Sequence, residues 1–151
     1  MRFNMFSPYY YYKIANFLYR KNVPFVPRAI TLFIRIVFTC YLPHRAQIDG
    51  LLVLGYGGMS VVIHDRVVIG KNCHIDQCVT IGGTSKKIEV PVLGDNVYVG
   101  AGAKIIGPVI IGDNVVIGAN AVVLRDIPNN CLAVGMPAKV IKHGIEKSDY
   151  V

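Results

Sequence analysis

The chain has 151 residues, enough for one domain with a sizeable hydrophobic core. Hydrophobic residues make up 53% of it and charged residues 17%, a composition that excludes intrinsic disorder. The net charge of +7 is confined to residues 1–45, which hold seven basic side chains and no acid, while the remainder is neutral. We therefore expect one globular domain that carries a basic amino-terminal segment.

Neither a membrane-spanning helix nor a secretory leader is predicted. The longest apolar run, 29–42, contains Arg35 and is shorter than the roughly 20 residues that a spanning helix requires. No small-residue cleavage site follows a short apolar core near Met1. The four cysteines match neither a CxxC pair nor a secreted disulfide framework, so free thiols are expected. These features favour a cytoplasmic protein, with no metal ion and no nucleic-acid partner.

The basic amino-terminal segment has the signals of two helices. Ser7 followed by Pro8 is a favourable helix start, and apolar residues recur at helical spacing over 9–21. After a proline-induced break, Pro27 opens a second helix that runs to Cys40. We expect a short helical segment before the main domain.

From about Ile48 onward the chain follows a six-residue repeat. Nine aliphatic residues share one register, each six after the last except for one gap of twelve: Ile69, Ile75, Ile81, Leu93, Val99, Ile105, Ile111, Ile117 and Val123. The third position after the aliphatic residue, where a tight corner favours tolerance of positive φ, repeatedly holds asparagine: Asn72, Asn96, Asn114 and Asn120. Each hexad therefore predicts a short strand followed by a corner.

A six-residue unit cannot bury its aliphatic side alone, so successive units must stack around a shared interior, as in a parallel β-helix. An alternating β-sandwich does not require a fixed register of six. In the doubled gap, a hexad starting at Lys87 would put a charge inside the stack, so 83–91 is predicted to project as a loop. The sequence thus predicts an all-β domain over 46–137 and a tail over 138–151.

Four strings within this register resemble the hexapeptide-repeat acyltransferases. They are Val-Thr-Ile-Gly-Gly-Thr at 79–84, Val-Gly-Ala-Gly-Ala-Lys-Ile at 99–105, Gly-Ala-Asn-Ala-Val-Val at 118–123 and Gly-Met-Pro-Ala-Lys at 135–139. They are most similar to the serine acetyltransferases and their relatives in polysaccharide biosynthesis. The resemblance implies a left-handed parallel β-helix of triangular cross-section, and a homotrimer with active sites between subunits.

The resemblance also implies an acetyl-CoA-dependent O-acetyltransferase in which an acceptor hydroxyl attacks the thioester directly. A backbone N–H near Gly82 or Gly83 would stabilise the oxyanion. Acetyl-CoA would lie in a groove between two coils, with its pantetheine arm against small residues and its phosphates near lysines. The alternative for the lysines is that they are ordinary solvated surface residues. The residues so implied are Gly100, Ala101, Gly102, Ala119, Lys104, Lys139 and Lys142.

The sequence departs from the serine acetyltransferases at three points. The basic segment replaces their large helical amino-terminal domain, their Asp-His pair aligns with Tyr56 and Gly57, and the His-Pro of their projecting loop aligns with Val90 and Pro91. These departures favour a sugar of surface polysaccharide biosynthesis, free or lipid-linked, as the acceptor. Serine acetylation for cysteine biosynthesis is the alternative. Two further hypotheses for the function are a non-catalytic β-helix assembly module and an inactive paralogue.

Acetyl transfer to a hydroxyl needs a general base, and histidine suits this role because its ordinary pKa is close to working pH. The chain has four histidines: His44, His64, His74 and His143. The first and last lie outside the repeats. His64 lies one turn of 18 residues before Gly82 and is favoured as the base, with Asp65 or a backbone carbonyl fixing its tautomer. A purely structural corner histidine is the alternative. His74 would point outward, to orient an acceptor or to pack on a neighbouring subunit.

The cations of the amino-terminal segment alternate with aromatic residues, a pattern suited to a helix pair on the anionic inner face of a membrane. Such a contact would bring the enzyme close to lipid-linked sugars. The alternative is that the helices cap the first coil or pack on neighbouring subunits, with their arginines kept in water by snorkelling.

Overall fold

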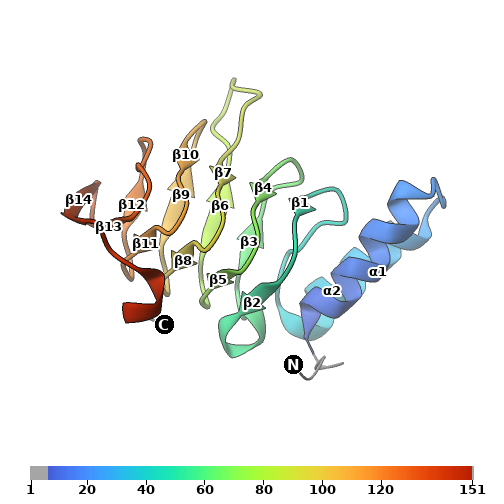
Figure 1. Ribbon diagram of the computed structural model, residues 1–151. Coiled ribbons are helices and arrows are strands. Elements are labelled where there is room, and N and C mark those ends of the chain that lie inside the picture. The colour runs from blue at the N-terminus through green and yellow to red at the C-terminus, as the bar shows by residue number, and fades with distance from the viewer. Residues whose placement is uncertain (1–6, 151) are drawn as a thin grey trace.

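The structure, a computed structural model, describes residues 7–150. Short parallel strands wind into a three-sided coil, and two helices pack against one end of it (Figure 1). The helices are α1 (Pro8–Arg20) and α2 (Val26–Phe38), and a 3-10 turn, η1 (Gly55–Gly58), interrupts the first coil. The predicted fold class is therefore confirmed: an all-β, left-handed parallel β-helix of hexapeptide repeats with a short helical amino-terminal segment.

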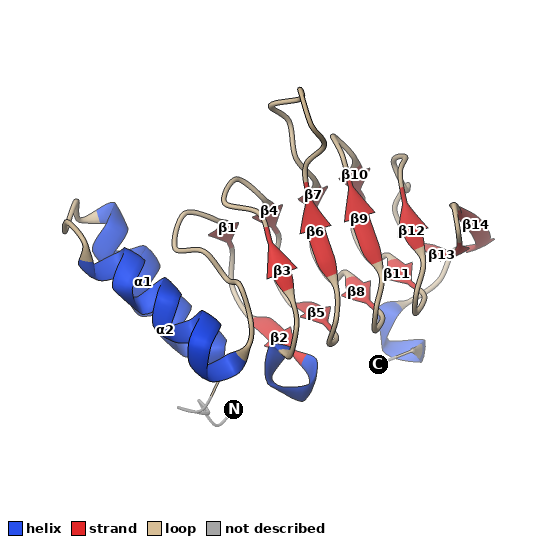
Figure 2. Cartoon of the chain, turned by 180° about the vertical axis from the view of Figure 1, so that it is seen from behind, coloured by secondary structure: helices blue, strands red, loops and turns tan. Residues whose placement is uncertain are grey.

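The strands form three sheets, one along each side of the coil. The first sheet contains β1 (Gln47–Ile48), β4 (Val68–Ile69), β7 (Val92–Leu93) and β10 (Ile110–Ile111). The second contains β2 (Leu52–Leu54), β5 (Cys73–Ile75), β8 (Tyr98–Val99), β11 (Val116–Ile117), β13 (Cys131–Gly135) and β14 (Ala138–His143). The third contains β3 (Val62–Ile63), β6 (Thr80–Gly82), β9 (Lys104–Ile106) and β12 (Val122–Val123). Figure 2 shows the same strands from behind.

The register between coils records where the hexad pattern is interrupted. A regular turn of three hexads pairs residues 18 apart, as with Ile63 and Ile81. The spacing is 24 between Ile69 and Leu93, because residues 83–91 leave the coil as a loop. Between β2 and β5 the spacing is 21, since η1 lengthens the first coil. The coil thus accommodates insertions at its corners without disturbing its core.

The repeating aliphatic position fills the interior of the β-helix. All nine of its residues are at most 1% exposed, and burial of each Val, Leu or Ile contributes about 1.5–3 kcal/mol. The four corner asparagines have φ between 54° and 56°, the left-handed conformation that the sequence predicts. The hexad therefore specifies both the inward side chain and the corner.

One face of the helix pair covers the open end of the first coil. Tyr12 and Ile34 are buried against the core. The Tyr12 hydroxyl donates a hydrogen bond to the Ala46 carbonyl at 2.7 Å, and the Asn16 amide donates to the His44 carbonyl at 2.8 Å. These bonds satisfy coil carbonyls that have no strand below them. The helices cap the first coil, one of the two roles considered from the sequence.

The opposite face of the helix pair is apolar and exposed. Leu32, Phe33, Ile36 and Val37 of α2 are 42–69% exposed, and Phe17 of α1 is 60% exposed. Their spacing of three and four residues places the α2 side chains on one stripe. Within residues 7–150, neither helix has the length and hydropathy needed to cross a membrane.

The carboxy-terminal residues add an edge to the second sheet. β14 runs antiparallel to β13, in the segment that the sequence treats as a tail. A short 3-10 turn, η2 (Lys147–Asp149), follows, and the Lys147 side chain donates to the Asn72 carbonyl at 2.6 Å. The segment is therefore packed onto the coil, because the last parallel strand offers unpaired backbone groups that an antiparallel neighbour can bond.

Candidate active site

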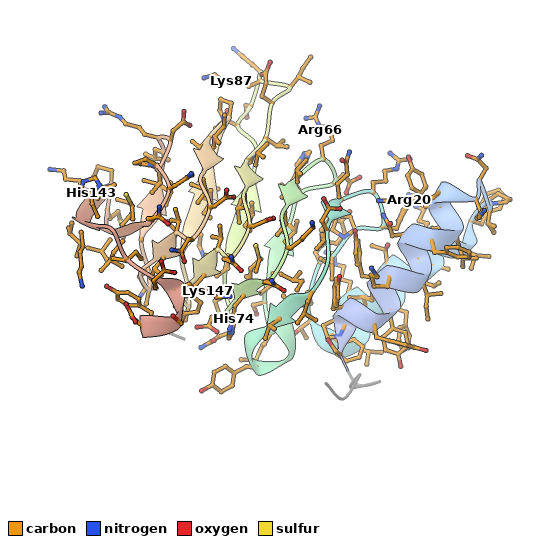
Figure 3. The ribbon with its side chains drawn as sticks, in the orientation of Figure 1. Arg20, Arg66, His74, Lys87, His143 and Lys147 are labelled. Atoms are coloured by element: carbon orange, nitrogen blue, oxygen red, sulfur yellow. The ribbon has the colours of Figure 1, made fainter. Side chains whose placement is uncertain are left out.

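Most of the sequence-predicted site residues lie at, or at the strand ends beside, two different corners of the coil; Lys139 and Lys142 lie apart on β14. We call the corner between the third and first sheets the loop edge; it contains residues 64–67 and 83–91. We call the corner between the second and third sheets the glycine edge; it contains residues 55–60, 76–79, 100–103 and 118–121. Figure 3 shows Arg66 and Lys87 on one side of the β-helix and His74 on the other. One subunit does not bring the two groups of residues together.

His64 lies at the loop edge, directly below Gly82. Its amide donates to the Ile81 carbonyl at 2.9 Å, in the 18-residue register expected from the sequence. A Cβ added to Gly82 would meet nothing within 4 Å, so the space beside this glycine is open. His64 also lines an open pocket of about 730 Å³ whose other walls are Tyr19, Arg45, Gln47, Asp65 and Arg66.

The hydrogen-bond partner of the His64 ring is neither of the two expected from the sequence, Asp65 or a backbone carbonyl. Its Nδ1 accepts a hydrogen bond from the Arg66 amide at 3.2 Å. Asp65, which the sequence offers as the group fixing the tautomer, instead accepts a hydrogen bond from the Tyr41 hydroxyl at 3.3 Å. The corner turn itself supplies the partner, because the amide two residues further on points back at the ring.

The small residues predicted to contact pantetheine all lie on the glycine edge. Gly100, Ala101 and Gly102 turn the corner after β8, and Ala119 turns the same corner one coil above. A Cβ on Gly100 would lie 2.8 Å from the Ala119 nitrogen, and one on Gly102, whose φ is +74°, would lie 2.1 Å from the Asn120 side-chain oxygen. We call these four residues the ledge. Only glycine fits at two of its positions, so no side chain rises there.

Of the three lysines predicted near the phosphates, Lys104 is the one whose side chain is bonded to the glycine edge. It begins β9, and its Nζ donates to the Cys78 carbonyl at 2.5 Å, on the same edge. Lys139 and Lys142 are exposed on β14, in the antiparallel edge of the second sheet. The three cations are therefore not clustered around one point of the chain.

A cluster that the sequence analysis did not assemble lies on the second sheet beside the glycine edge. His74 Nε2 is 3.1 Å from Asp76 Oδ1, and the Tyr98 hydroxyl donates to Asp76 Oδ2 at 2.6 Å. The His74 and Tyr98 rings meet edge to face, with centroids 5.3 Å apart. Burial, together with the neighbouring Asp76 carboxylate, raises the pKa of Tyr98 to about 12, so its hydroxyl stays a neutral donor.

The signal for this cluster is present in the sequence. His74 and Asp76 are two residues apart, which places them on one side of a strand. Tyr98 pairs with His74 at a spacing of 24, which is one turn plus the looped-out hexad. The 24-residue spacing between His74 and Tyr98 indicates that they are neighbours only once residues 83–91 are known to leave the coil.

These observations define a parallel β-helix built from hexapeptide repeats, and comparison with known proteins agrees. The bacterial transferase hexapeptide family (six repeats) matches residues 91–125. The chain is 39% identical over 132 residues to the serine acetyltransferase of Synechococcus elongatus, covering 86% of this chain and 54% of that protein. It is 41% identical over 132 residues to the serine acetyltransferase of Helicobacter pylori, covering 86% of this chain and 77% of that protein.

Solved structures agree with these matches. The serine acetyltransferase of Brucella abortus strain S19 in complex with coenzyme A superposes with a TM-score of 0.83 at 29% identity, covering 88% of this chain and 54% of that one. The chain thus spans about half the length of that structure and of the Synechococcus relative. It belongs to the serine acetyltransferase family. The resemblance inferred from the repeat strings is confirmed.

Proposed function

We propose that the protein is an acetyl-CoA-dependent O-acetyltransferase that moves acetyl to a hydroxyl by direct attack. The observation that carries this proposal is the identity of 39–41% to serine acetyltransferases over 86% of the chain. The structure with coenzyme A from Brucella abortus, which this fold superposes on, supports acetyl-CoA as the donor. The ledge supports a course for pantetheine along the glycine edge, because no large side chain blocks it.

The chemistry requires a base near the acceptor hydroxyl and a donor near the thioester oxygen. Two histidines of the β-helix, His64 and His74, are candidates for the base. Backbone amides at Gly82 or Gly83 are the candidates for the oxyanion donor, since the space at Gly82 is open. Lys104 is the best placed of the three predicted lysines to meet a phosphate of the cofactor.

The relatives favour L-serine as the acceptor over the sugar preferred in the sequence analysis, because the proteins named above are serine acetyltransferases. One feature of the chain supports a sugar as second candidate. The positions aligned with the Asp-His pair of the family carry Tyr56 and Gly57, and Tyr56 is 82% exposed on η1. We propose L-serine first and test both.

The test is release of coenzyme A thiol by the purified protein. Acetyl-CoA is supplied with L-serine, with nucleotide sugars, or with no acceptor. Serine-dependent release supports the primary proposal, and release only with a sugar would move the acceptor to the second candidate. Binding of acetyl-CoA without release under any condition would indicate an inactive paralogue and contradict the enzymatic proposal.

A homotrimer with active sites between subunits is part of the proposal. Val92 and Ile110 point outward from the first sheet and are 38% and 60% exposed, which supports packing against another copy. The separation of the loop edge from the glycine edge supports a shared site, because a neighbouring subunit can bring its loop edge to this ledge. Light scattering coupled to gel filtration measures the mass; a monomer at working concentration would contradict it.

We also propose that the exposed face of α1 and α2 contacts an anionic membrane surface. This face combines apolar side chains with cations, and Lys21 Nζ lies 5.9 Å from the Phe17 ring centroid. Among residues 7–45 there is no acidic side chain to oppose anionic lipid.

Flotation with vesicles separates this contact from simple capping. The intact chain is expected to float with phosphatidylserine-containing vesicles and not with neutral ones. Ile36→Glu, at a position 69% exposed on α2, should abolish flotation, whereas Ile141→Glu, at a position 61% exposed on β14, should not. Absence of flotation by the unchanged protein would refute the membrane contact.

A further inference from the structure

The two candidate histidines differ in which ring nitrogen can accept a proton. A neutral imidazole has one N–H and one lone pair, and each partner fixes which nitrogen has which. In His64 the lone pair is on Nδ1 and accepts the Arg66 amide hydrogen at 3.2 Å, so Nε2 carries the hydrogen. The nitrogen of His64 that could act as a base is therefore already occupied by the backbone.

His74 has the reverse arrangement. Its Nε2 lies 3.1 Å from Oδ1 of the Asp76 carboxylate, which can only accept, so this contact favours the hydrogen on Nε2 and the lone pair on Nδ1. No hydrogen-bond partner for that Nδ1 occurs among residues 7–150. A histidine whose N–H is held by a carboxylate, with its other nitrogen free, is oriented to take a proton and to be stabilised once it is charged.

Asp76 is in turn held by neighbours in the coils above and below. Tyr98 donates to its second oxygen at 2.6 Å. The carboxylate occupies the space over Gly55 in the coil below, where an added Cβ would lie 2.2 Å from Oδ1. By register, Gly100 stands opposite Asp76 in the coil above. The side chains of His74 and Asp76 are 21% and 18% exposed, so the pair is partly shielded and still accessible.

The position of this pair distinguishes it from His64. Asp76 begins the glycine edge, and its neighbour in the coil above, Gly100, is the first residue of the ledge. His64 lies at the loop edge, on the far side of the third sheet. Within one subunit, the histidine with a free nitrogen is thus the one beside the predicted course of pantetheine.

We propose that His74 is the general base of the acetyl transfer, with Asp76 and Tyr98 as positioning residues. The assignment rests on the proposed acetyltransferase function. The acceptor hydroxyl oxygen bonds to the thioester carbonyl carbon while Nδ1 of His74 takes the hydroxyl proton. The carbon–sulfur bond then breaks, and the proton passes to the coenzyme A sulfur. The products are the acetyl ester and the free thiol, and the ring returns to its neutral form.

The test measures kcat and KM of the full chain with whichever acceptor supports turnover. His74→Ala should lower kcat about 10²–10⁴-fold, with the KM for acetyl-CoA unchanged. Added imidazole should restore part of the lost kcat, which a merely structural histidine would not allow. The control is His143→Ala, on β14 and bonded through Nδ1 to Cys131, which should keep the kcat of the unchanged protein.

The positioning residues are tested separately. Asp76→Asn should lower kcat without changing KM, and adding it to His74→Ala should cause no further loss, because the two act as one unit. Tyr98→Phe should cause a smaller loss than Asp76→Asn. Gly55→Ala should lower kcat as well, since its methyl group displaces the carboxylate. If His74→Ala loses its native circular dichroism, Asp76→Asn and Gly55→Ala test the same assignment with the histidine in place, and both should have a lower kcat than the unchanged protein.

The outcomes separate this inference from the proposed function. Turnover by the unchanged protein with normal kcat in His74→Ala would overturn the base assignment and leave the acetyltransferase intact. A loss confined to His64→Ala would transfer the role to His64. No turnover by the unchanged protein with any acceptor would overturn both.

Discussion

Truncation of one inward-facing isoleucine tests whether the hexad specifies the core. Ile111 and Ile110 are neighbours in β10, yet Ile111 is 1% exposed and Ile110 is 60% exposed. Ile111 stacks between Leu93 of the coil below and Ile127 of the coil above. Ile111→Ala removes buried methyl groups and leaves a cavity between two coils, which costs about 2–5 kcal/mol. The control is Ile141→Ala, because Ile141 is 61% exposed on β14, away from the first-sheet face proposed to pack on another copy; it should change the unfolding free energy by about 0.5 kcal/mol or less.

The assay is thermal unfolding followed by circular dichroism at one fixed protein concentration, because oligomerisation makes Tm depend on concentration. In a domain of this size, a loss of about 3 kcal/mol lowers Tm by about 6–12 °C, so Ile111→Ala should be well separated from Ile141→Ala. Equal shifts for the two variants would refute the assignment of one side chain to the interior and the other to the surface.

Two further predictions concern the glycine edge. Ala101→Trp should abolish acetyl-CoA binding, measured by calorimetry, with circular dichroism unchanged, because the indole would cover the ledge; retained binding would contradict this course for pantetheine. Cys78 is exposed, whereas burial raises the pKa of Cys40 to about 12, so iodoacetamide should label Cys78 and leave Cys40 unmodified in the native protein. Acetyl-CoA should slow the labelling of Cys78, followed by mass spectrometry, and equal rates with and without it would place the cofactor elsewhere.

The local rules of the fold can be derived from the sequence alone. The six-residue register identifies the residues that point inward, since direction depends only on position within a hexad. It also identifies Asn72 and its equivalents as corners, because the left-handed conformation costs asparagine little. The charge of Lys87 marks the hexad that cannot enter the core, and the structure has residues 83–91 outside the coil.

The repeat does not predict which residues of neighbouring coils pair with one another. The extra residues of η1 and of the loop at 83–91 change the register, so the partner of His74 is Tyr98, 24 residues on, rather than the residue 18 on. The segment 138–143 also has no repeat signal, and it pairs as β14 because the last strand of the second sheet has free backbone groups.

The sequence by itself determined the stacked architecture, the inward side chains and the corners, all of which depend on a pattern of six residues, and the resemblance of four strings to known proteins indicated the family. Only the tertiary structure decided which candidate residues share a corner and which nitrogen of each histidine is free. The ring partners themselves are local, since the Arg66 amide lies two residues after His64 and the Asp76 carboxylate two residues after His74. What holds Asp76 beside His74 comes from the next coil, because Tyr98, 22 residues on, donates to that carboxylate. A local repeat fixes the direction of a side chain, but the three-dimensional shape of the corner and the neighbouring coil decide which ring nitrogen of a histidine meets a partner.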